Sequence, residues 1–148
     1  MALLVELACY ERKLALGCSR RRLEVRGTRP TGTCRGFLVD GAVACLVLCT
    51  VPDQGAALAE LRRVLRAGGT LCFYEHIRSH QPAVAHGQEL VNRVFWPRAF
   101  GGCHTARDTP AAILAAGFDI ERQRRIAVHP VAAVFPAATV TIGRARRI

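Results

Sequence analysis

The amino-acid sequence predicts an α/β fold, and three segments carry that prediction. Residues 42–50 and 70–77 are largely apolar, as are the strands of a parallel sheet that is buried on both faces. Between them, residues 54–66 place leucine and valine at helical spacing. The order strand, helix, strand predicts a βαβ unit in which the two strands are parallel neighbours.

The helix of this unit has sequence signals at both ends. Asp53 stands where an N-cap is expected, because a carboxylate there can accept hydrogen bonds from free backbone amides. Arginines crowd the last turn, where the helix dipole favours cations. Gly68 and Gly69 follow and are expected to end the helix.

The flanking segments complete the predicted domain of 148 residues. Residues 3–15 predict a helix, because leucines recur there at helical spacing with charges between them. Residues 22–26 alternate in period two and predict a short strand, and residues 27–36 predict a loop.

Beyond the βαβ unit the alternation continues. Residues 83–100 predict a mixed helical stretch that ends near Pro97, and residues 109–116 predict a short helix. Residues 118–128 and 139–144 predict two strands, which we expect to form an antiparallel hairpin at the edge of the parallel sheet.

The composition is basic and apolar. The formal net charge is +10, with Lys13 the only lysine, and 51% of the residues are hydrophobic. The arginines are scattered and have no aromatic residues between them, which favours a GC-rich coding sequence over a nucleic-acid surface. The longest apolar run, residues 42–51, is too short to span a bilayer, and we expect a cytoplasmic protein.

The cysteine pattern favours reduced core residues. The number of cysteines, seven, is odd, and no C-x-x-C pair occurs. We therefore expect neither a disulfide framework nor a metal site, and the adjacent pair Cys103-His104 has no second pair to complete one.

Two stretches carry a resemblance to a known family. Residues 39–53 (V-D-G-A-V-A-C-L-V-L-C-T-V-P-D) and 57–76 (A-L-A-E-L-R-R-V-L-R-A-G-G-T-L-C-F-Y-E-H) follow one another at a characteristic spacing. Together they resemble strand four, helix D, the glycine turn and strand five of class I S-adenosylmethionine (SAM)-dependent methyltransferases of the methyltransferase domain 11 type. Ala67 stands where that family usually has proline.

Glu75-His76 and residues 101–109 (G-G-C-H-T-A-R-D-T) narrow the resemblance. They are similar to the methyltransferase-like protein seven group of thiol methyltransferases and their bacterial relatives. The resemblance covers residues 39–148, which leaves residues 1–38 as an atypical N-terminal segment of one truncated domain.

The resemblance implies SAM as the cofactor and a methyl acceptor that is a small molecule or lipid-like. In an open α/β sheet, ligands bind at the carboxyl ends of the strands. The cofactor is then expected against the end of the first apolar strand, at Cys45, Leu46 and Val47.

The same edge holds the polar candidates. We expect Glu75 and Arg107 to bind the substrate, and His76 or His104 to act as the base that deprotonates a thiol or amine acceptor. The same residues could instead have purely structural roles. Cys45 and Cys49 would also suit the core, Glu75 could be a strand-end charge in water, and Arg107-Asp108 could be an ion pair with a helix cap.

The family's cofactor loop has no counterpart in this sequence. The loop G-x-G-x-G after strand one and the acidic residue that ends strand two are both missing, so we expect a partial Rossmann-like sheet that lacks strands one and two. The strand at residues 42–50 would then be an exposed apolar edge that could pair with a partner. Residues 28–38 also depart from the family, and we suggest that a local frame error altered them, a hypothesis that the nucleotide sequence of the gene would test.

These observations predict a fragment of a SAM-dependent methyltransferase whose own activity is doubtful. Two alternatives remain: a non-catalytic interaction protein that pairs through its sheet edge, and a basic nucleic-acid-binding module.

Overall fold

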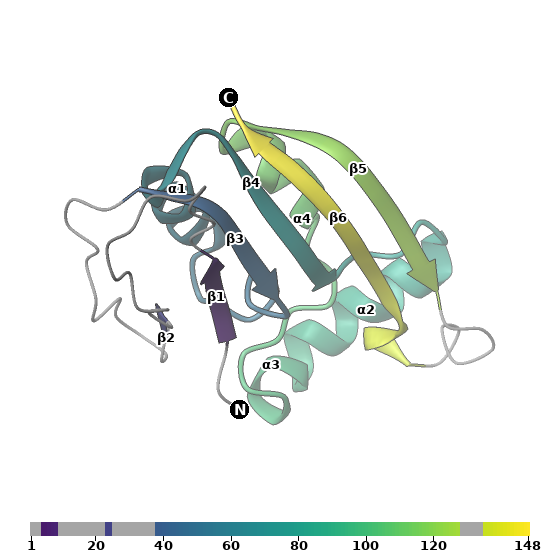
Figure 1. Ribbon diagram of the computed structural model, residues 1–148. Helices are drawn as coiled ribbons and strands as arrows, with labels where there is room; N and C mark the ends of the chain where they lie inside the picture. The colour runs from purple at the N-terminus through teal and green to yellow at the C-terminus, as the bar shows by residue number, and fades with distance from the viewer. Residues whose placement is uncertain (1–3, 9–22, 25–37, 128–134) are drawn as a thin grey trace.

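The computed structural model describes residues 4–8, 23–24, 38–127 and 135–148 (Figure 1). Within these residues, six strands form one sheet in the order β2-β1-β3-β4-β6-β5. Their bounds are Leu4–Ala8 (β1), Leu23–Glu24 (β2), Val39–Cys45 (β3), Leu65–His76 (β4), Phe118–Ala127 (β5) and Thr139–Arg147 (β6). β3 and β4 are parallel, and helix α1 (Gln54–Val64) joins them, which confirms the predicted βαβ unit.

β3 is shorter than the apolar run that predicted it. The strand ends at Cys45, because Leu46 takes a left-handed conformation with φ of 54° and turns the chain out of the sheet. Ala42 and Ala44 are buried, whereas Val43 and Cys45 are exposed. We expected a strand at residues 42–50 that is buried on both faces. That expectation was wrong in two respects: the strand ends at Cys45, and one of its faces is exposed.

Helix α1 follows the sequence signals at its start and departs from them at its end. The carboxylate of Asp53 accepts a hydrogen bond from the backbone N–H of Ala56, so the predicted N-cap is confirmed. The helix ends at Val64, ahead of the two glycines, because Leu65 already pairs with Val39 as the first residue of β4.

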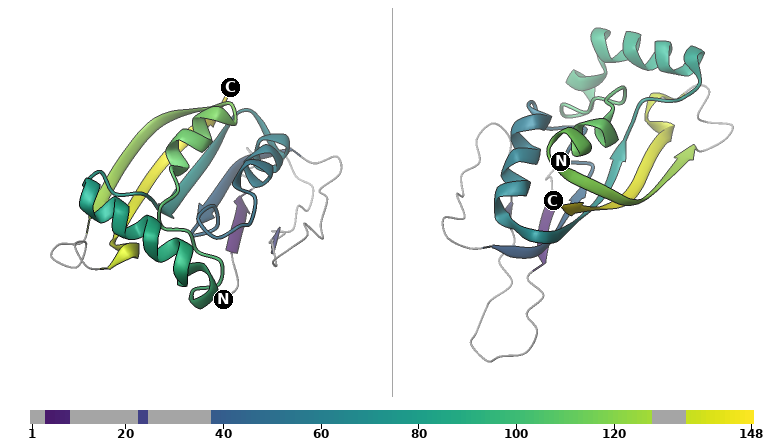
Figure 2. Two further views of the ribbon diagram at one scale, coloured as in Figure 1. Left: turned by 180° about the vertical axis from the view of Figure 1, so that it is seen from behind. Right: turned by 90° about the horizontal axis from the view of Figure 1, so that it is seen from above.

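A short 3-10 helix, η2 (Pro136–Ala138), precedes β6, and the described α-helices all lie on one face of the sheet (Figure 2). They are α1, α2 (Pro82–Val94), α3 (Trp96–Ala99) and α4 (Thr109–Ala115). The predicted mixed stretch at residues 83–100 is thus two helices, separated at Phe95, whose backbone φ of −149° is not helical. Asp108 caps α4 by accepting a hydrogen bond from the Ala111 amide.

The core lies between this helical layer and the sheet. It is built from the apolar sides of α1 and α4 and from the inward residues of the strands. Its large members are Leu48, Leu58, Leu61, Leu65, Leu71, Phe73, Ile113 and Phe118. On the other face of the sheet, Val43 and Ile142 remain 37% and 45% exposed.

The C-terminal strands form the predicted hairpin. β5 and β6 are antiparallel, and β6 adds to β4 in antiparallel direction. Gly143 lies where β6 passes Phe73, and a Cβ there would approach the ring of Phe73 and stand 2.6 Å from the carbonyl oxygen of Arg122. Only glycine allows these strands to approach so closely.

The N-terminal prediction was wrong in its described part. Residues 4–8 form β1, which pairs antiparallel with β3, instead of the helix expected at residues 3–15. β1 covers the side of β3 that was expected to be an exposed edge, so that expectation was also wrong. β2 lies within the strand predicted at residues 22–26. The loop expected at residues 27–36 lies outside the described residues, and so does nearly all of the segment for which a frame error was suggested.

Candidate functional site

The candidate site lies where β3 and β4 end, and a buried carboxylate organises it. Glu75 is fully buried at the end of β4. Its Oε1 accepts hydrogen bonds from the backbone N–H groups of Val47 and Leu48, and its Oε2 accepts one from Cys49, each at 3.0 Å. The loop that follows β3 is therefore folded around this side chain, and Glu75 is not a strand-end charge in water.

Burial has a large effect on the acidity of this group. It raises the pKa of Glu75 to about 8, although the N–H donors of Leu48 and Cys49 lower that pKa by favouring the carboxylate. Both oxygens are engaged with the loop. Glu75 thus acts on the backbone conformation of the site.

Arg107 holds the same loop through its carbonyl groups. Its Nη1 donates to the carbonyl oxygens of Leu48 at 2.8 Å and Val51 at 2.7 Å, and its Nη2 donates to Pro52 at 3.4 Å. Burial lowers the pKa of this guanidinium. A buried carboxylate and a half-buried guanidinium thus fix the N–H and the C=O groups of one loop, and the two predicted substrate residues both serve in this support.

The three predicted cofactor residues differ in accessibility. Cys45 is exposed and Leu46 is partly exposed, whereas Val47 is only 3% exposed. The amide of Leu46 donates to the carbonyl of Tyr74 at 2.8 Å and so maintains the left-handed turn. A non-glycine residue in this conformation is uncommon and often marks a functional site. Of these three residues, Cys45 and Leu46 have side chains that a ligand at this edge could reach.

The predicted bases lie in different surroundings. The Nδ1 atom of His76 is 3.4 Å from the Cys103 sulfur and 3.7 Å from the Cys49 sulfur. His104 donates its backbone N–H to the carbonyl of Cys49 at 2.7 Å. Burial, and then the charge of Arg107, lowers the pKa of the His104 imidazole. The surroundings of His104 thus favour its neutral imidazole, while the ring of His76 faces two thiols.

Cys49, His76 and Cys103 form a cluster that the sequence analysis missed. Their ligand atoms all lie within 4.8 Å of one another, and the two sulfurs are 3.9 Å apart. Contact with Cys49 lowers the pKa of the Cys103 thiol to about 7, and the same contact raises that of Cys49 to about 11. The order of the parallel strands could have placed Cys49 near His76, but no local pattern indicates that the segment before α4 brings Cys103 to them.

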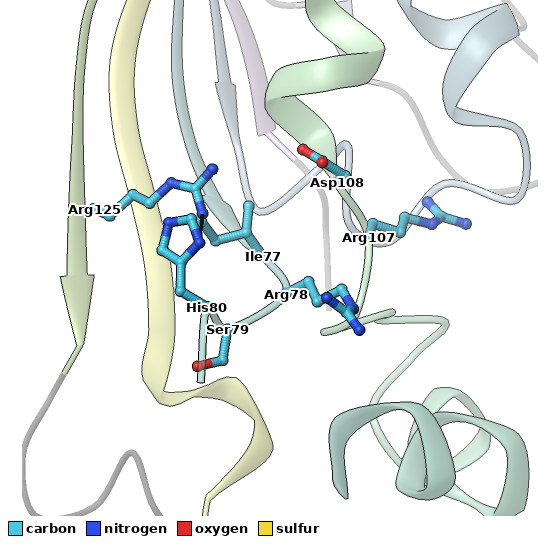
Figure 3. A pocket seen from close by; sticks show the side chains of 7 residues that line it. All are labelled: Ile77, Arg78, Ser79, His80, Arg107, Asp108 and Arg125. Atoms are coloured by element: carbon cyan, nitrogen blue, oxygen red, sulfur yellow. Dashed lines mark hydrogen bonds between the residues drawn. The ribbon is translucent and has the colours of Figure 1, made fainter. Parts of the chain in front are cut away.

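A shallow depression adjoins the site (Figure 3). Its lining residues are Ile77, Arg78, Ser79, His80, Arg107, Asp108 and Arg125. Arg78 forms an ion pair with Glu89 at 3.0 Å, and Nη1 of Arg125 lies 3.4 Å from Nδ1 of His80. The guanidinium of Arg107 points away from these groups toward its own loop, so the cations of the depression are directed to separate partners.

Known proteins are similar to this chain in the segment that contains the βαβ unit. A sequence family described as "methyltransferase domain" matches residues 37–73, which include β3, α1 and most of β4. Among solved structures, a SAM-dependent methyltransferase from Methanosarcina mazei is similar with a TM-score of 0.55 and 17% identity, over 76% of this chain and 62% of that chain. The chain has the fold of a class I methyltransferase. The match confirms the predicted fold relationship, and the Methanosarcina mazei protein is itself described as SAM-dependent.

The methyltransferase fold also occurs in the [4+2]-cyclase SpnF, which is similar with a TM-score of 0.54 and 19% identity over 74% of this chain and 50% of that chain. The fold by itself therefore does not define the reaction. Among the described residues, no helix is long and apolar enough to cross a membrane.

Curated relatives agree with the narrower resemblance. Thiol S-methyltransferase TMT1B of Mus musculus is 39% identical over 71 residues, which are 48% of this chain and 29% of the relative. Thiol S-methyltransferase TMT1A of Homo sapiens is 36% identical over 80 residues, which are 54% of this chain and 33% of the relative. The chain therefore matches about a third of the length of these relatives.

Proposed function

We propose that this chain forms the acceptor-side part of a SAM-dependent methyltransferase that acts on a small-molecule thiol. The supporting observation is the loop after β3, which Glu75 and Arg107 hold at the carboxyl ends of two parallel strands. Ligands of α/β sheets bind at such an edge. The thiol acceptor is suggested by the relatives that share this segment.

SAM bound at this edge would supply a methyl group from its sulfonium to the thiolate sulfur of the acceptor, which would give a methyl thioether and S-adenosylhomocysteine. The acceptor's proton goes to His104, whose surroundings favour the neutral imidazole that can accept it. The protein's main contribution is to align the two sulfurs with the methyl group between them.

We further propose that the described part of the chain holds only one side of SAM. Cys45 and Leu46 can contact the methionine portion, but β1 is antiparallel and the sequence has no G-x-G-x-G loop for the rest of the cofactor. Each missing hydrogen bond to a charged group weakens binding by about 1.5–3 kcal/mol. Losing several would take a micromolar ligand to about millimolar affinity or weaker, since 1.4 kcal/mol is tenfold.

Equilibrium titration with SAM tests this proposal. The chain itself should bind SAM weakly or not at all, and a chimera in which residues 1–38 are replaced by the N-terminal part of a class I methyltransferase should bind it saturably. The chimera should then convert SAM and a small aliphatic thiol into S-adenosylhomocysteine and a thioether.

The matched variants of the chimera are Glu75→Ala, which releases the loop, and Glu89→Ala, which removes a carboxylate paired with Arg78 at the surface. Only the first should weaken SAM binding. Micromolar binding by the unmodified chain would contradict the one-sided site, and a folded chimera without binding would contradict the proposed function.

A further inference from the structure

Cys49, His76 and Cys103 come from three separate segments and converge on one point. Cys49 lies in the loop after β3, His76 ends β4, and Cys103 precedes α4. Cys49 is fully buried and Cys103 is 8% exposed. From the convergence of two thiols and one imidazole nitrogen, we propose that these residues form a binding site for a divalent metal ion of the zinc type.

The distances between the ligand atoms match those of a tetrahedral zinc site. Bond lengths of about 2.3 Å to sulfur and about 2.0–2.1 Å to nitrogen imply a sulfur–sulfur distance of about 3.8 Å and sulfur–nitrogen distances of about 3.6 Å. The corresponding distances in this structure are 3.9 Å, 3.4 Å and 3.7 Å. An ion can therefore bind all three atoms with shifts of only a few tenths of an ångström.

The chemistry of the ligands selects the class of metal. Two thiolates and an imidazole favour zinc and other borderline or soft ions over magnesium and calcium, which prefer oxygen. Two thiolates also neutralise the charge of a divalent ion, which matters in a site with so little exposure to water.

The surroundings of the cluster contain a donor suited to a bound thiolate. Trp96 packs with Cys49 and Cys103, and its buried Nε1–H finds no nitrogen or oxygen acceptor in the part of the chain that the structure describes. A metal-bound thiolate at Cys103 would accept from this donor, as the outer hydrogen bonds of metal sites do. The carbonyl of Cys49 is itself fixed by the His104 amide.

The proposed ion would have three protein ligands and a fourth position for water or another small ligand. Zinc sites with three protein ligands keep such an open position. The ion would also join the ends of β3 and β4 to the segment before α4, and so stabilise the same loop that Glu75 and Arg107 hold. This inference concerns metal binding alone and does not depend on methyl transfer.

Titration of the reduced full chain with Co²⁺ and then Zn²⁺ tests the site. The chain should carry Cys9→Ser, Cys18→Ser and Cys34→Ser, so that cysteines outside the described residues cannot contribute. We expect one equivalent of Co²⁺, with the intense visible bands of tetrahedral cobalt and a thiolate-to-cobalt charge-transfer band, and displacement by Zn²⁺. Zinc should also raise the Tm.

The variants decide which residues bind. Cys49→Ser and Cys103→Ser should abolish the charge-transfer band and the Tm shift, and His76→Asn should weaken metal binding at least tenfold. Cys45→Ser and Cys72→Ser are the matched controls, because each removes one thiol outside the cluster and should leave both readouts unchanged.

Circular dichroism establishes which variants are folded. If Cys103→Ser does not fold, X-ray absorption spectroscopy of the zinc-loaded parent chain takes the place of that variant. We expect it to show two sulfur ligands and one imidazole ligand around the zinc ion. The proposal fails if no stoichiometric metal binds, if folded Cys103→Ser binds as well as its parent, or if the shell lacks sulfur. It also fails if mass spectrometry shows that the cluster forms a Cys49–Cys103 disulfide that persists under the reducing conditions of the titration.

Discussion

Glu75 illustrates how much of this site depends on single residues. Its position at the end of a predicted strand made it a candidate from the sequence, and so did the position of Arg107 in a segment typical of the family. Their partners could not be predicted. Three amides and three carbonyls of one loop are their hydrogen-bond partners, and backbone groups carry no sequence signal.

Replacing Glu75 should destabilise the protein strongly. Glu75→Ala leaves three buried N–H groups without an acceptor, and each such group costs about 1–3 kcal/mol, so we expect a loss of at least about 3 kcal/mol in the free energy of unfolding. Glu75→Gln should cost less, because its oxygen can still accept from Val47 and Leu48. Denaturant unfolding measures both changes.

Glu89→Ala is the control for that measurement. Glu89 pairs with Arg78 at the surface, so its loss should change the free energy of unfolding by less than about 1 kcal/mol. If Glu75→Ala were as stable as Glu89→Ala, the buried carboxylate would not support the loop.

At the scale of elements, the sequence predicted best where local and tertiary preferences agree. The Asp53 cap and the apolar spacing of α1 specify a helix without reference to the rest of the chain. The apolar run at residues 42–50 did not show where β3 ends, because the residues that leave the strand are as apolar as those within it. The leucine spacing in residues 3–15 was overridden by strand pairing with β3.

The close approach of β4, β5 and β6 at Gly143 can be tested by substitution. Gly143→Ala should lower the free energy of unfolding by about 1–3 kcal/mol, because the new methyl group meets Phe73 and the carbonyl of Arg122 in a close-packed region. Gly87→Ala is the opposite case: Gly87 lies inside α2 with nothing within 4 Å of the added Cβ. It should stabilise the protein by about 0.5–1 kcal/mol.

Thermal unfolding of both variants checks whether Gly143→Ala lowers the stability and Gly87→Ala raises it. A stabilising Gly143→Ala would mean that β5 and β6 separate more easily than their packing indicates. A destabilising Gly87→Ala would show that this part of α2 faces something other than solvent.

At the scale of the whole molecule, the described residues form one sheet with their α-helices on a single face (Figure 2). The apolar runs and the helical spacing between them predicted that β3, α1 and β4 form a βαβ unit, and the methyltransferase resemblance implied the same unit. It did not predict β1, whose direction is opposite to that of β3. The Cys49, His76 and Cys103 cluster was also missed, because it depends on how three distant segments meet and not on their spacing along the chain.

Because β1 occupies one edge of β3, it should limit the rate at which another strand can pair there. A separate polypeptide that carries a parallel strand for β3 cannot pair until β1 has left, so its binding would be a strand exchange with an obligatory opening step. The observed association rate should rise with the concentration of the added polypeptide and then reach a plateau at the opening rate of β1, as stopped-flow fluorescence can measure. Deleting residues 1–8 should remove the plateau. A rate that stays proportional to concentration in the intact chain would mean that the two strands do not compete for the same side of β3.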